Sequence, residues 1–108
     1  MMEYNVKITD RALADMEAIY NYIANNLQAP DTAMKQYDRI ADEIESFGIF
    51  PNRNKLFESQ PEREMGMRQS LVDNYSAIYT VDEETDTVFV LRVLYSASDI
   101  ITRLRENR

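Results

Sequence analysis

The chain opens with a short alternation of apolar and polar residues and continues with two long stretches of helical periodicity. Tyr4, Val6 and Ile8 have the two-residue spacing of a half-buried strand. Residues 10–26 and 30–47 each repeat apolar side chains every three or four positions, as amphipathic helices do. Because so few residues separate them, these two helices are predicted to pack as an antiparallel hairpin.

Strand-like patterning returns in the second half of the chain, after an irregular segment at 51–64 that contains two prolines. The pattern predicts three strands, at 67–72, 75–81 and 87–95. Asp73–Asn74 is a two-residue turn signal, so the first two of these strands form a hairpin. The third strand is nearly unbroken in apolar character, which is typical of a central strand covered on both faces.

Capping residues complete the predicted order of elements. Thr9–Asp10 is expected to cap the first helix, and Ser98–Asp99 a last short helix over 100–105. The resulting order is βααβββ(α), in which the N-terminal strand joins the sheet of the later strands. We therefore expect an α+β fold with an antiparallel sheet packed against the N-terminal helical hairpin. At 108 residues, the whole chain, 1–108, is expected to form one domain.

The sequence contains no cysteine and no histidine. These absences remove disulfides, thiolate nucleophiles, histidine acid–base pairs and the usual zinc ligand sets. Any catalysis must then use Arg, Lys, Tyr, carboxylates or backbone groups, and we expect neither a metal ion nor a cofactor. No apolar run approaches the roughly 20 residues of a membrane span, and no basic leader is present. We therefore expect a cytoplasmic protein without membrane association.

Acidic residues outnumber basic ones, nineteen to twelve, which gives a net charge of −7. This balance is the opposite of the basic footprint of a general nucleic-acid-binding protein. The acids of the predicted turn at 82–86 are interpreted as solvated groups rather than as a metal or catalytic site. The same interpretation applies to four acids on the second helix: Asp38, Asp42, Glu43 and Glu45.

Tyrosines and arginines of the predicted sheet are the best candidates for a functional surface. Tyr75 and Tyr79 share one strand face, and Tyr95 ends the central strand. Arg68 and Arg92 lie on neighbouring strands, so these five residues are expected to cluster.

Arg92 is unusual because it interrupts an otherwise apolar central strand. A buried guanidinium without a partner is costly, so Arg92 requires a carboxylate, a carbonyl or water. A structural ion pair, with Asp99 as the candidate partner, is the simpler interpretation. Direct contact with a binding partner is the alternative.

Six short segments, taken in their order and spacing, resemble a known protein family over nearly the whole chain. They are Tyr4-x-Val6-x-Ile8-Thr9, Ile19-x-x-Tyr22-Ile23-Ala24, Phe50-Pro51-x-Arg53, Gly66-Met67-Arg68, Asn74-Tyr75-x-Ala77-x-Tyr79-x-Val81 and Arg92-Val93-Leu94-Tyr95-x-x-x-Asp99-Ile100. This pattern resembles the RelE/ParE superfamily of type II toxin–antitoxin toxins, and its ParE branch most of all. The fold of that superfamily is the one predicted above.

The resemblance implies two alternative activities. RelE-like members are ribosome-dependent mRNA endonucleases that use basic residues and tyrosine, whereas ParE-like members poison DNA gyrase by protein contact. Here Ser76 and Ser96–Ser98 stand where basic residues are expected, so we favour the gyrase inhibitor, which has no catalytic residues. A nuclease of this chain would need substitute catalysts: Arg68, Tyr79, Arg92 and Tyr95.

The resemblance also implies a cognate antitoxin that wraps the toxin, with a possible hetero-oligomer. The groove between the helical hairpin and the sheet is its expected surface. The residues expected to contact the target or the antitoxin are Arg53, Arg68, Tyr75, Tyr79, Arg92, Tyr95 and Asp99. A third alternative is a non-toxic protein with this fold that only binds an antitoxin.

Overall fold

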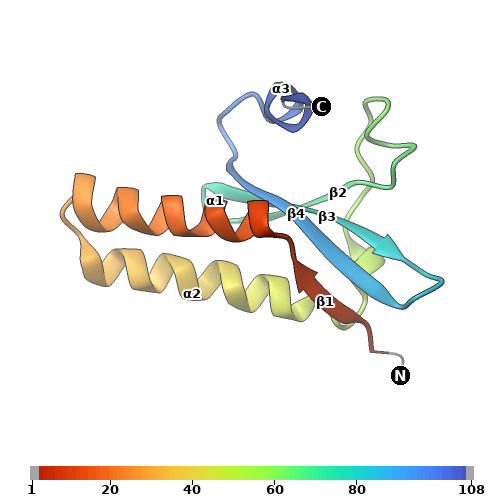
Figure 1. Cartoon of the computed structure of the whole chain (residues 1–108), viewed down its shortest axis with the longest axis horizontal. Coiled ribbons are helices and arrows are strands. Elements are labelled where there is room, and N and C mark those ends of the chain that lie inside the picture. Colours follow the sequence, from red (N-terminus) through yellow and green to blue (C-terminus); the bar gives the residue numbers. More distant parts are fainter. Residues whose placement is uncertain (1–2, 107–108) are drawn as a thin grey trace.

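The structure is a computed structural model and describes residues 3–106, so the four terminal residues of the predicted domain 1–108 lie outside it. Its elements follow the predicted order and are β1 (Asn5–Ile8), α1 (Asp10–Asn21), η1 (Tyr22–Asn26), α2 (Pro30–Ser46), η2 (Pro51–Arg53), β2 (Arg68–Val72), β3 (Tyr75–Asp82), β4 (Thr87–Tyr95) and α3 (Ile100–Arg105). Helices α1 and α2 lie side by side as an antiparallel hairpin next to the sheet (Figure 1). The predicted α+β fold with the order βααβββ(α) is confirmed.

The helical hairpin begins and ends at residues that suit helix termini. Thr9 caps α1, because its hydroxyl oxygen accepts the backbone N–H of Ala12 at 3.2 Å. Pro30 occupies the first turn of α2, where its missing N–H costs nothing. The first helix continues to residue 26 as predicted, but its last five residues form the π-helix η1. The N–H of Leu27 accordingly reaches back five residues to the carbonyl of Tyr22.

The sheet has the order β1-β4-β3-β2, and its three later strands are antiparallel, as predicted. β1 instead pairs parallel with β4, which corrects the expectation of a wholly antiparallel sheet. The parallel direction of β1 follows from the helical hairpin that comes after it. Helix α1 leads the chain away from the end of β1, and α2 returns it to the point where β1 starts. There the N–H of Tyr4 donates to the carbonyl of Gly48 at 2.9 Å. β2 therefore begins in the same direction as β1, and two hairpin turns leave β4 in that direction too.

A β-bulge in β4 decides which side chains of this strand face the helices. The register with β3 shifts between Ile78 and Tyr79, and Leu91 is the extra residue on β4. Val88 and Val90 face the core, so an unbroken two-residue alternation along β4 would also point the side chain of Arg92 into the core. The bulge instead places Val93 in the core. The central position predicted for this strand is confirmed, since β4 lies between β1 and β3.

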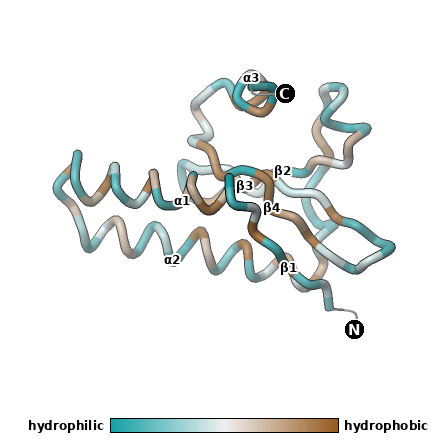
Figure 2. The backbone as a smooth tube through the Cα atoms, viewed as in Figure 1, coloured by the Kyte–Doolittle hydropathy of each residue, from teal (hydrophilic) through white to brown (hydrophobic). Residues whose placement is uncertain are grey.

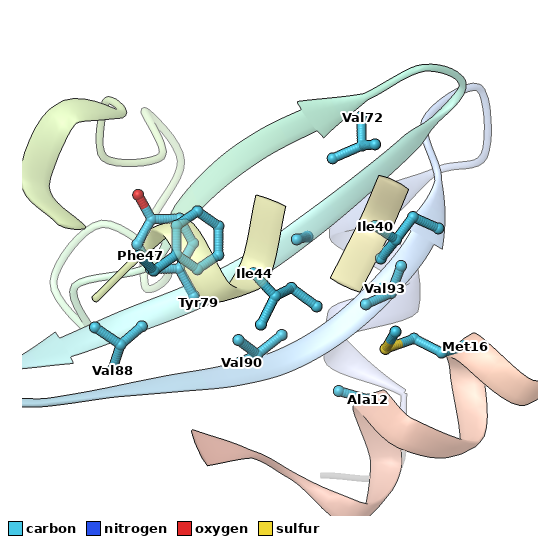
Figure 3. Packing of buried hydrophobic residues seen from close by; sticks show 11 residues of the cluster. Ala12, Met16, Ile40, Ile44, Phe47, Val72, Tyr79, Val88, Val90 and Val93 are labelled. Atoms are coloured by element: carbon cyan, nitrogen blue, oxygen red, sulfur yellow. The ribbon is translucent and has the colours of Figure 1, made fainter. Parts of the chain in front are cut away.

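The main core lies between the helical hairpin and the sheet (Figure 3). The rings of Phe47 and Tyr79 stack there with centroids 4.0 Å apart. Its buried residues are Ala12, Met16, Ile40, Ile44, Phe47, Val72, Ala77, Tyr79, Val88, Val90 and Val93. Hydrophobic positions run along β3 and β4, while the turn that joins them is hydrophilic (Figure 2). The core therefore fixes the sheet against the hairpin and leaves that turn in solvent.

The opposite face of the sheet is covered as well, because Ile78 and Leu94 point away from the main core and are nevertheless buried. Helix α3 contacts β4 and is joined to the irregular segment by Arg105. The guanidinium of Arg105 donates two hydrogen bonds of 2.9 Å to the carboxylate of Glu62, whose side chain is fully buried. The patterning of the sequence had given no sign of this buried ion pair.

Candidate functional site

A hollow of about 720 Å³ lies where α1 and η1 meet the ends of β3 and β4. We call it the tyrosine groove, after Tyr22, Tyr75 and Tyr95. Ile19 and Val93 are among the apolar residues of its wall, and Arg103 of α3 closes one side. The groove thus lies between the helical hairpin and the sheet, at the position expected from the sequence.

Three tyrosines give this groove its chemical character. The rings of Tyr75 and Tyr95 meet edge to face, with centroids 5.9 Å apart. Burial raises the pKa of Tyr75, and the neighbouring phenols of Tyr95 and Tyr22 raise it further. Tyr75 therefore stays protonated near neutral pH, where its hydroxyl can donate a hydrogen bond.

The wall of the groove contains the ion pair that Arg92 was predicted to need, but with a different partner. The Arg92 guanidinium donates to both carboxylate oxygens of Asp15, at 2.8 and 3.0 Å. This carboxylate also accepts the N–H of Val93 at 2.9 Å and raises the pKa of Arg92. The expectation that Asp99 fills this role is wrong. Asp99 instead caps α3 by accepting the N–H and the hydroxyl of Thr102.

Tyr79 lies away from the groove, in the main core, with none of its surface exposed. Tyr75 and Tyr79 do share a strand face, but it is the face covered by the helices. The Tyr79 hydroxyl donates to the carbonyl of Pro51 at 2.6 Å and accepts the amide of Asn54 at 3.0 Å. Burial is the main cause that raises the pKa of Tyr79. The predicted cluster of five residues is therefore not formed.

Arg53 and Arg68 are engaged by backbone carbonyls near η2. Arg53 donates to the carbonyls of Ser46 and Ile49 at the end of α2, at 3.2 and 3.1 Å. Its planar group also lies 5.2 Å from the centre of the Phe47 ring. Arg68 lies beside Tyr79 in the strand register and donates to the carbonyls of residues 52 and 54. Both arginines therefore join the irregular segment to the rest of the fold.

Glu43 also differs from its predicted role as a solvated acid of the second helix. Its carboxylate accepts hydrogen bonds from Arg53 and from Ser70 of β2. It thus ties α2 to the sheet. Among residues 3–106, no group of three acidic side chains is arranged to hold a metal ion.

Family comparison decides what kind of protein carries this groove. The sequence matches, over residues 6–100, the family described as the ParE toxin of type II toxin–antitoxin systems, parDE. This chain belongs to the ParE toxin family. It is therefore a RelE/ParE superfamily toxin of a type II toxin–antitoxin system, as the sequence segments had indicated.

Solved structures support the same fold for this ParE-family toxin. A chain of the chromosomal ParDE system from Pseudomonas aeruginosa is 24% identical, with a TM-score of 0.70. The match covers 86% of the present chain and 96% of the Pseudomonas chain. A chain of the RelBE2 complex from Mycobacterium tuberculosis is 23% identical, with a TM-score of 0.56 and coverages of 91% and 97%. A chain of the RelE–RelB complex from Pyrococcus horikoshii is 14% identical, with a TM-score of 0.62 and coverages of 89% and 98%. No curated protein matched.

The groove of this toxin contains residues that the sequence had not singled out as functional. Tyr22, Leu27 and Arg103 join Tyr75 and Tyr95 there. Of these residues, Tyr22 has 52% of its surface exposed. Its position beside the apolar stripe of the helix, rather than within it, was the one available signal.

Over residues 3–106, no helix is both long enough and apolar enough to cross a lipid bilayer.

Proposed function

We propose that this toxin acts by protein contact on DNA gyrase, without catalysis, and that a cognate antitoxin neutralises it. The observation that carries the proposal is that three of the four substitute nuclease residues, Arg68, Tyr79 and Arg92, are held by hydrogen bonds within the fold. Tyr79 is buried, and the side chains of Arg92 and Asp15 are only 11% and 14% exposed. A phosphoryl-transfer site needs cations and an acid–base pair free to meet the substrate.

Charge and composition support the same proposal. The net charge of −7 opposes docking on ribosomal RNA. Ser76 and Ser96 stand where basic residues are expected for a nuclease. Ser76 is fully buried, and its hydroxyl shares a hydrogen bond of 2.7 Å with the hydroxyl of Ser96. What remains exposed at the tyrosine groove is aromatic and apolar, which suits recognition of a protein.

A supercoiling assay with purified gyrase tests the proposed target. Addition of the purified toxin is expected to inhibit supercoiling or to trap cleaved DNA, and prior addition of the cognate antitoxin is expected to prevent both effects. Lack of inhibition at large molar excess contradicts the gyrase proposal.

Two further measurements separate the alternatives. Toeprinting on translating ribosomes is expected to find intact mRNA, whereas cleavage would establish the RelE-like endonuclease in place of the gyrase inhibitor. Induced expression is expected to arrest growth. Normal growth at high levels of folded protein would instead favour a non-toxic protein that only binds an antitoxin.

A further inference from the structure

We propose that Ile49 and Phe50 are the anchor with which this toxin binds DNA gyrase, at a positively charged part of the enzyme's surface. The inference rests on the proposed function, because gyrase is the target named there. It goes further by assigning the contact to one end of the molecule and to two specific side chains. Both side chains belong to the segment 48–52, which we call the Phe50 arch.

The Phe50 arch is fixed at both of its ends to neighbouring segments. At one end, the carbonyl of Gly48 accepts the N–H of Tyr4 at 2.9 Å. At the other end, the amide of Asn52 donates to the carboxylate of Glu83 at 2.9 Å, and this carboxylate also accepts the Tyr4 hydroxyl at 2.7 Å. The arch therefore spans from the start of β1 to the β3–β4 turn, at the end of the sheet remote from the tyrosine groove (Figure 1).

Arg53 holds the backbone of the arch in one conformation. Its guanidinium donates to the carbonyls of Ser46, Ile49 and Phe50, at 3.2, 3.1 and 3.4 Å. The backbone N–H of Arg53 donates a further hydrogen bond of 3.2 Å to the Phe50 carbonyl. A loop that is already ordered loses little conformational entropy when it binds, so the arch is preorganised for contact with a partner.

The arch presents two apolar side chains that the fold leaves in solvent. Phe50 is 68% exposed and Ile49 is 43% exposed. The Phe50 backbone is also left-handed, with φ 54° and ψ 55°, a conformation whose cost glycine would avoid. Backbone strain of this kind is found mainly at functional sites, and aromatic residues are enriched at the centres of protein interfaces. The strained and exposed phenylalanine therefore indicates a binding role.

The charges beside the arch favour a positively charged partner. Glu83 and Glu84 are exposed in the β3–β4 turn, which contains two further acids. The neighbouring cations are Arg53, which pairs with Glu43 at 3.1 Å, and Arg68, which donates to backbone carbonyls. This end of the molecule thus has an excess of negative charge. An enzyme that acts on DNA presents positive charge where it holds phosphate groups, so gyrase offers the complement.

Gyrase inhibition by variants of the arch tests the inference. The measured quantity is the concentration of toxin that halves supercoiling by purified gyrase. Phe50→Gly and Phe50→Ala remove the aromatic ring, Phe50→Tyr keeps it, and Glu84→Lys reverses one charge of the turn. Met34→Ala and Glu17→Lys are matched controls, because they make the same kinds of change at a hollow between α1 and α2, away from the arch. Circular dichroism and thermal melting verify that each variant is folded.

Phe50→Gly and Phe50→Ala are expected to raise the inhibitory concentration about tenfold or more, whereas Phe50→Tyr and both controls are expected to stay within about twofold of the wild type. Phe50→Gly also relieves the backbone strain. Loss of inhibition in a variant that melts no lower than the wild type therefore excludes a purely structural effect. Glu84→Lys is expected to weaken inhibition at low salt and to differ less from the wild type at high salt, because exposed charges are screened.

Unchanged inhibition by Phe50→Gly and Phe50→Ala overturns the inference and leaves gyrase as the target. Equal losses in the two controls also overturn it, because the effect is then not specific to the arch. A Glu84→Lys toxin that inhibits as well as the wild type at low salt overturns the charge complementarity. Absence of inhibition by the wild-type toxin overturns the gyrase proposal itself, and with it the inference.

Two measurements on Phe50→Gly exclude other occupants of the arch. Its affinity for the purified cognate antitoxin, measured by biolayer interferometry, is expected to equal that of the wild type. Weaker antitoxin binding with normal gyrase inhibition assigns the arch to the antitoxin and overturns the inference. Sedimentation velocity is expected to give the same mass for both toxins. A wild-type dimer that Phe50→Gly dissociates assigns the arch to self-association and overturns the inference as well.

Discussion

The carboxylate of Asp15 on α1 holds the guanidinium of Arg92 on β4 through two hydrogen bonds, and it also closes the backbone edge of that strand at Val93. One side chain thus neutralises a charge, satisfies a backbone N–H and fixes the helical hairpin to the sheet. Because 77 residues separate the two partners, the pair is formed only by the complete fold.

Asp15→Ala is expected to destabilise the toxin by about 3 kcal/mol, because it leaves a largely buried guanidinium and the Val93 N–H without an acceptor. Asp15→Asn keeps one acceptor oxygen and is expected to cost less. Urea denaturation at neutral pH measures both. The control is Arg39→Ala, which breaks the exposed pair with Asp73 and is expected to leave the free energy of unfolding almost unchanged. Equal losses in Asp15→Ala and Arg39→Ala would contradict this account.

Tyr79→Phe is expected to lower stability by about 1–2 kcal/mol, because it removes the hydrogen bonds with Pro51 and Asn54. Growth arrest at equal levels of folded protein is expected to persist, since the hydroxyl is buried. Tyr95→Phe, in the groove, is the matched control for loss of a phenol and is expected to leave stability unchanged. Abolished toxicity with unchanged stability in Tyr79→Phe would instead mark a catalytic tyrosine.

The periodic elements of this fold could be predicted because each is specified locally. The span 87–95 matches β4, and the cap at Thr9 and the hairpin at Asp73–Asn74 are as predicted. Local signals do not specify pairing between distant segments. For that reason the parallel position of β1 was missed.

The candidate site was predicted only in part, for a related reason. Alternation correctly placed Tyr75 and Tyr79 on one face, but it could not tell that Phe47 covers the second of them. The partner of Arg92 depends on a bulge at Leu91, which leaves no mark in the pattern. Arg103 belongs to the groove only because α3 folds back beside β4.

The buried Glu62 predicts a specific dependence of stability on pH. Hydrogen bonds from Arg105 are the main cause that lowers its pKa from 4.5 to about 2. A folded-state pKa below the unfolded one means that the carboxylate stabilises the fold above pH 4.5, and that this contribution disappears as the pH falls towards 2.

The difference in free energy of unfolding between the wild type and Glu62→Gln is therefore expected to be largest above pH 4.5 and to shrink below it. Urea denaturation at constant ionic strength from about pH 6 to about pH 2 measures it. Amide exchange of α3 is expected to rise in Glu62→Gln, because Arg105 then loses its charged acceptor. A difference that does not change with pH contradicts the assignment.

Phe50 predicts a stabilising substitution. Its backbone is left-handed, with φ 54° and ψ 55°, and 68% of its surface is exposed, so little packing offsets the strain. The left-handed conformation costs a non-glycine residue about 1–2 kcal/mol, and glycine gives back roughly 0.5–1 kcal/mol in chain entropy. Phe50→Gly is therefore expected to stabilise the toxin by about 0.5–1 kcal/mol in urea denaturation. Phe50→Ala keeps the strained Cβ and is expected to give no such gain. If alanine stabilises as much as glycine, then removal of the exposed ring, rather than relief of backbone strain, is the cause.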